Sequence, residues 1–161
     1  MSALFEPLSF KRGPAMKNRF MLAPLTNQQS HADGTISEEE FRWLSMRAEG
    51  GFGLTMTCAA SVQDGGQGFP GQLGAHDECH IAGLTRLAGA LRANGAHAVL
   101  QLHHAGLRSP LSVIGRQPIC PSDHSETNAR AMTLAEIERT RGDFIAAARR
   151  CEKAGFDGVE L

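Results

Sequence analysis

Short apolar segments alternate with helical patterns along almost the whole of this chain. Strand-like segments cover residues 52–60, 98–102 and 158–161, and helical patterns cover residues 37–49, 78–94 and 133–154. Parallel strands need a long crossover between them, usually a helix, so this order predicts a parallel α/β sheet with helices packed against it. A doubly wound sheet and a (β/α)8 barrel both fit the order.

Two capping motifs mark where helices begin. Ser37 with Glu40, and Thr133 with Glu136, have the spacing of a capping box. In this motif each side chain accepts a hydrogen bond across the first helical turn from a backbone N–H group that the helix leaves free. We expect the second of these helices to turn apolar residues inward, namely Ile137, Phe144, Ala148 and Cys151.

The N-terminal region predicts a hairpin that precedes the alternating part of the chain. Residues 8–10 and 19–25 have strand character and are separated by Gly13 and Pro14, a pair typical of turns. The second strand should end at about Pro24, because proline cannot donate to a strand ladder.

Between the two architectures, the sequence favours the barrel. No G-x-G-x-x-G motif follows a strand, so the dinucleotide-binding form of the doubly wound sheet lacks its phosphate turn. A (β/α)8 TIM barrel needs roughly 250 residues. Residues 1–161 offer about half of such a barrel, with a hairpin and about three and a half βα units, and the sequence stops inside a predicted strand.

Composition narrows the possible partners. The net charge is -1 and no basic stripe is present, which argues against nucleic acid. No apolar run has the roughly 18–20 residues of a membrane span, and residues 1–7 do not resemble a signal peptide, so the cytoplasm is expected.

The four cysteines have no C-x-x-C pair and are interpreted as reduced structural thiols. The chain contains no tyrosine, so it holds no phenolic acid.

Three clusters follow the predicted strands, where βα-barrels place their chemistry. Residues 24–26 offer a hydroxyl, residues 59–61 offer small side chains beside which a flat ligand can reach the backbone, and residues 101–104 offer an amide and two imidazoles. Simpler roles stay open at this point. Thr26 can be an ordinary strand-end residue, and an amide such as Gln101 more often caps backbone groups than binds a cofactor.

The histidines and glycines have simpler interpretations too. A metal site at His103 and His104 is disfavoured, because no third ligand has suitable spacing. The other histidines are interpreted as loop or surface residues: His31, His76, His80, His97 and His124. The glycines of residues 65–68 are interpreted as a flexible loop rather than a phosphate cradle, since no helix-opening Lys-Ser/Thr follows them.

Taken in order, several segments resemble the N-terminal half of the old yellow enzyme family, the NADH:flavin oxidoreductases. The matching segments are residues 4–8, 18–26, the helix and Gly pair before residue 52, 101–106, 129–133 with Glu136 and Ile137, and 154–160. The resemblance implies FMN as cofactor, NADH or NADPH as reductant, and hydride transfer to a small-molecule activated alkene.

The resemblance also implies roles for particular residues. Pro24, Leu25 and Thr26 would pack against FMN, with Thr26 bonding the carbonyl edge of the flavin. Ala60 would lie against its ring, Gln101 would bind its pyrimidine side, and His104 would be a catalytic residue near the mouth of the site. Leu107 stands where many members of the family have arginine, and Arg108 follows it. The substrate-clamping pair, the proton-donating tyrosine and the phosphate site are expected beyond Leu161.

Three functional hypotheses result. The first is an FMN-dependent ene-reductase whose chain, as given, is inactive alone. The second is a non-catalytic half-barrel that self-assembles, for example as a homo-oligomer, or docks on a partner. The third is a barrel lyase or metal-dependent hydrolase that uses His103 and His104. The sequence identifies neither the alkene nor the preferred nicotinamide coenzyme.

Overall fold

The computed structural model describes residues 3–161. The α-helices are α1 (Glu38–Glu49), α2 (Ile81–Ala93), α3 (Leu111–Ile114) and α4 (Leu134–Ala154). The strands are β1 (Met21–Leu22), β2 (Leu54–Met56), β3 (Ala60–Ser61), β4 (His97–His103), β5 (Ile119–Cys120), β6 (Arg130–Ala131) and β7 (Gly158–Glu160). Short 3-10 turns lie at Ala3–Phe5, Asp64–Gly66, Glu78–His80, Gly106–Arg108 and Ser125–Thr127.

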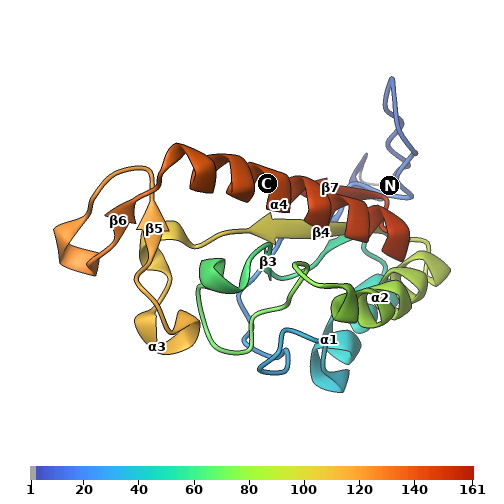
Figure 1. Cartoon of the computed structure of the whole chain (residues 1–161). Coiled ribbons are helices and arrows are strands. Elements are labelled where there is room, and N and C mark those ends of the chain that lie inside the picture. The colour runs from blue at the N-terminus through green and yellow to red at the C-terminus, as the bar shows by residue number, and fades with distance from the viewer. Residues whose placement is uncertain (1–2) are drawn as a thin grey trace.

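The main sheet is parallel, and β7 lies beside the long strand β4 (Figure 1). β1 pairs with β2, β2 pairs with β4, and β4 pairs with β7 on its other edge. A doubly wound sheet reverses its strand order at a switch point, whereas a barrel adds each new strand to the same side. The observed order is that of a partial (β/α)8 barrel, which confirms the predicted fold class.

The predicted strand at residues 52–60 is interrupted. β2 and β3 both pair with the same edge of β4, but the offset between partners changes by one residue from Leu54↔His97 to Ala60↔Leu102. At the interruption, the backbone N–H of Gln101 donates to Oγ1 of Thr57 at 3.3 Å instead of to a backbone carbonyl. The extra residue acts as a bulge that bends the strand just before its functional end.

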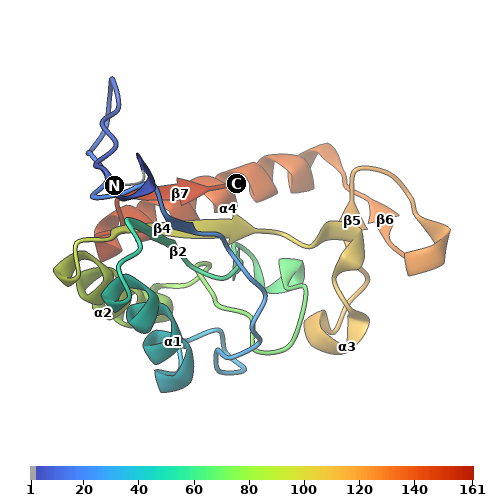
Figure 2. The ribbon, with the colours of Figure 1, turned by 180° about the vertical axis from the view of Figure 1, so that it is seen from behind.

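The helices cover one face of the sheet, and Figure 2 shows the opposite face without a helix. Along β4 the side chains alternate. Ala98, Leu100 and Leu102 are buried in the core, which they share with residues of α1, α2 and α4. The alternate residues, Gln101 and His103 among them, are half-buried on the other face. The helix-free face therefore carries polar groups near the carboxyl end of the central strand.

One of the two predicted capping boxes forms completely. Thr133 and Glu136 make both reciprocal bonds at the start of α4, and Gly155 ends that helix in the left-handed region with φ 88°. At α1, Ser37 accepts from the backbone N–H of Glu40, but the Glu40 side chain does not bond back. Glu40 is instead wholly buried and accepts from the Ser30 hydroxyl, so this part of the prediction was wrong.

The predictions for the N-terminal hairpin and for the inward face of the last helix also need correction. The predicted N-terminal hairpin is reduced to a single antiparallel bridge between Leu8 and Met16, and the second strand keeps only two residues. Ile137 was expected to face inward but is 44% exposed. The reason is that the buried residues of α4 all lie in its C-terminal half, where the helix packs on α2 and β4.

The segment between β4 and α4 contains structure of its own. It holds α3 and a two-stranded sheet of β5 and β6, and it projects to one side of the barrel part (Figure 1). We call residues 105–132 the excursion. All four cysteines are free thiols, and of them only Cys79 is exposed. In the described part of the chain, no helix is both long enough and apolar enough to cross a membrane.

Replacement of Leu100 by alanine should strongly destabilise this fold. Leu100 is fully buried at the centre of β4, so truncation leaves a cavity under both sheet and helices and should lower the free energy of unfolding by about 2–5 kcal/mol. Leu111→Ala is the matched control, since Leu111 is 62% exposed and a change within about 0.5 kcal/mol is expected. Urea titration followed by circular dichroism measures both, and equal effects would contradict this core assignment.

Candidate active site

The predicted site residues all lie at the carboxyl ends of neighbouring strands. Pro24, Leu25 and Thr26 follow β1, Ala60 lies in β3, and Gln101 lies in β4. These strands are parallel and adjacent, so their carboxyl ends share one edge of the sheet. Within the described residues, the Thr26 side chain is exposed and has no hydrogen-bond partner, whereas Ala60 is fully buried as a member of the core.

The segment after β1 is supported from behind by Glu40. The Ser30 hydroxyl donates to this carboxyl group, and the side chains of Asn27 and Cys58 lie beside it. Burial raises the pKa of Glu40 above its ordinary value of 4.5, because a charged carboxylate is poorly solvated there. Sequence reasoning missed this buried acid, since its spacing from Ser37 suggested a cap on the helix surface.

Gln101 connects two strands at the rim. Its Nε2 donates to Oε2 of Glu160 on β7 at 2.8 Å, while its backbone N–H is taken by Thr57. One N–H of the amide is therefore engaged, and the carbonyl oxygen and the second N–H stay available to a ligand. Gln101 can therefore both donate a hydrogen bond to a bound molecule and accept one from it.

His104 is held by hydrogen bonds at both ring nitrogens. The backbone N–H of Gly106 donates to Nδ1 at 3.0 Å, so Nδ1 carries no proton, and Nε2 donates to Oε1 of Gln63 at 3.0 Å. Burial lowers the pKa of His104, and the neighbouring His103 lowers it further. The ring is neutral, and its polar atoms bind the protein's own loops.

The glycines at residues 65–68 do not form the expected flexible loop. Gly65 and Gly66 are buried in a 3-10 turn, and a methyl group on Gly66 would overlap the His104 ring. His80 was expected in a loop or at the surface, but it is 2% exposed and joins two segments. Its Nδ1 accepts from the N–H of Asp77, and its Nε2 lies 3.0 Å from the carbonyl oxygen of Asp33.

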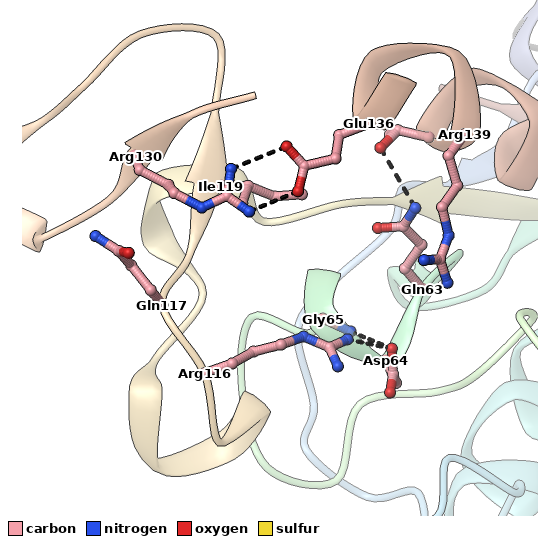
Figure 3. A pocket seen from close by; sticks show the side chains of 10 residues that line it. Gln63, Asp64, Gly65, Arg116, Gln117, Ile119, Arg130, Glu136 and Arg139 are labelled. Atoms are coloured by element: carbon pink, nitrogen blue, oxygen red, sulfur yellow. Dashed lines mark hydrogen bonds and ion pairs between the residues drawn. The ribbon is translucent and has the colours of Figure 1, made fainter. Parts of the chain in front are cut away.

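A polar cavity of about 250 Å³ lies between the excursion, α4 and the turn after β3 (Figure 3). Arg130 forms a bidentate pair with Glu136 at 2.9 and 2.5 Å, and Arg116 pairs with Asp64. The Arg130 guanidinium holds the pKa of Glu136 down to about 2. Because both carboxylates that line the cavity are paired with arginine, these contacts fasten the excursion to the rim.

Comparison with known proteins places this chain in a family. Residues 3–161 match the model of the NADH:flavin oxidoreductase / NADH oxidase family, and the chain belongs to that family.

Individual relatives also match almost the whole chain. A probable NADH-dependent flavin oxidoreductase of Bacillus subtilis is 43% identical over 98% of this chain and 43% of its own length. An NADPH dehydrogenase of Geobacillus thermodenitrificans is 36% identical over 99% of this chain and 47% of its own length. The old yellow enzyme homologue from Zymomonas mobilis has a TM-score of 0.88 and 32% identity over 98% of this chain and 47% of its own. The chain thus spans less than half the length of these relatives.

Substitution of Gly66 by alanine should displace His104 and destabilise the rim, because the new methyl group has no space beside the ring. Gly89→Ala is the matched control. Gly89 lies inside α2 with no atom within 4 Å of the added carbon, so the change should stabilise by roughly 0.5–1 kcal/mol. Thermal unfolding of both variants checks this expectation. A Gly66 variant that melts at the wild-type temperature would show that the two groups are not packed together.

Glu40→Gln should remove a pH dependence of stability. The folded pKa of Glu40 lies above the unfolded one, so its contribution is full below about pH 4.5 and decreases as the pH rises. Stability of the wild type should therefore decline relative to the variant as the pH rises above about 4.5. The control is Glu49→Gln, the same change at the exposed end of α1. Urea titrations at several pH values above 4.5 measure the free energy of unfolding. The assignment would be contradicted if this free energy changed with pH in the same way in both variants.

Proposed function

We propose that this chain contributes the flavin-binding half of an FMN-dependent oxidoreductase of the ene-reductase type. In this proposal residues 1–161 form the N-terminal half of one FMN-binding barrel domain. The observation that carries it is the meeting of Thr26, Ala60 and Gln101 at one sheet edge in a chain of this family. A cytoplasmic location stays part of the proposal and rests on the sequence alone.

The residues at this edge fit a flavin ring. Its pyrimidine edge alternates carbonyl oxygens and N–H groups, so it needs partners that both donate and accept. The free Thr26 hydroxyl and the half-used Gln101 amide are such partners. Pro24 and Leu25 offer apolar surface, Leu25 being 55% exposed. Ala60 is fully buried, backbone included, so it would support the strand end behind the ring and would not touch the ring.

When bound, FMN supplies a ring that accepts hydride from NADH or NADPH and passes it to an activated alkene. The Thr26 hydroxyl, placed at the carbonyl edge, would donate most strongly to the electron-rich reduced ring and so favour it. In this proposal His104 lies near the mouth of the site. Since both of its nitrogens are bonded to the protein, it would hold the rim in shape.

A second candidate is a half-barrel that is completed by another copy or another chain. Its support is that β1 and β7 form the two edges of the sheet and, among residues 3–161, have no further strand beside them. Apolar side chains are exposed there, Met21 at 51% and Val159 at 38%. This candidate predicts a species larger than the monomer that binds no flavin.

The absorption spectrum of the purified chain with added FMN, read together with a sizing column, decides between the two candidates. A visible flavin band that elutes with the protein supports the first. A colourless oligomer that takes up no FMN would reject it for this chain.

Gln101→Leu should weaken FMN binding roughly 3- to 10-fold, the equivalent of one hydrogen bond of about 0.5–1.5 kcal/mol. The matched control is Gln117→Leu, because Gln117 is exposed on the excursion and bonds only the carbonyl of Asn128. FMN fluorescence quenching measures both affinities. Equal affinity for the Gln101 variant and the wild type would remove Gln101 from the flavin site.

A further inference from the structure

A buried glutamine lies behind the second imidazole of the rim. Gln72 is 1% exposed and its amide has three close partners. The backbone N–H of Gly68 donates to Oε1 at 2.7 Å, and Nε2 donates to the carbonyl oxygen of Ala59 at 3.2 Å. Nε2 also lies 3.0 Å from Nδ1 of His103. A backbone N–H can only donate and a carbonyl can only accept, so the two backbone partners set which end of the amide is nitrogen.

This orientation determines the tautomer of His103. The second N–H of the amide points to Nδ1, which must accept it and therefore carries no proton. The proton of a neutral ring is then on Nε2. No hydrogen bond from the described residues reaches Nε2, and the ring is half-buried. Burial also lowers the pKa of His103, which favours the neutral ring.

The position of His103 places this free N–H at the candidate site. His103 lies two residues after Gln101 on the same face of β4, which is roughly 7 Å further toward the rim. A carbon added to Gly68 would lie 3.3 Å from Cε1 of His103, so the turn before Gln72 runs beside the ring. His104, by contrast, bonds Gln63 and Gly106 and has no free nitrogen.

We infer that Gln72 is a positioning residue that fixes His103 as an Nε2–H donor at the mouth of the site, directed to a carbonyl oxygen of a bound molecule. The identity of that molecule rests on the proposed function, whereas the tautomer rests on the contacts of Gln72 alone. The chain has no tyrosine, so a neutral imidazole is a donor that this half of the site can offer.

The test is a long-range ¹H–¹⁵N spectrum of the histidine rings in the labelled chain, with the His103 signals assigned by their loss in His103→Gln. The wild type should show Nε2 protonated and Nδ1 unprotonated. Gln72→Glu keeps an acceptor for Gly68 but replaces the donor to His103 with a carboxylate. In this variant Nδ1 should become protonated, and the pKa of His103 should rise. Gln117→Glu, the same change on the excursion, should leave the His103 signals unchanged.

Two results would overturn the inference: a wild-type ring protonated at Nδ1, or a Gln72→Glu spectrum identical to that of the wild type. Addition of FMN separates this inference from the proposed function. A chain with the expected tautomer that binds no FMN would keep the role of Gln72 and reject the flavin site. A chain that binds FMN but has His103 protonated at Nδ1 would support the flavin site and reject the role of Gln72.

Discussion

The pairing of β4 on both of its edges is the contact on which the rest of the structure depends. One edge holds β2 and β3, the other holds β7, and the inner side chain of Leu100 lies at the centre of the core. The helices α2 and α4 pack against each other and both contact this strand. Because the strand is fixed on three sides, the polar residues at its end, Gln101 and His103, have defined positions.

A series of polar contacts shapes the rim beyond this strand. Gln63 accepts from His104 and donates to Thr140 of α4 at 3.3 Å, while Gln72 joins the Gly68 turn to His103. Two glutamines from the segment after β3 therefore set the directions of two adjacent histidines. Both rings carry their proton on Nε2, but the Nε2–H of His104 donates to Gln63, whereas no described residue accepts from that of His103.

Part of this could be predicted from local sequence. The helix from Thr133 to Gly155 begins and ends as expected, because capping depends on residues within one turn of each other. The prediction was correct for Ser37 and wrong for Glu40, although both rested on the same local spacing. The local spacing does indicate a cap, but the side chain finds Ser30, ten residues away, in the interior. The prediction that Ile137 faces inward was wrong, because apolar periodicity does not reveal where along a helix the packing partner ends.

The sequence by itself determined the alternation of strands and helices and the resemblance to the family, since these follow from periodicity and ordered motifs. The tertiary structure alone decided the bulge at Thr57, the ordered excursion and the tautomers of His103 and His104. Those features depend on hydrogen bonds between residues up to 52 positions apart, as between Asp64 and Arg116. A hydrogen-bond partner that distant in the chain leaves no local pattern, so only the folded backbone brings the two groups together.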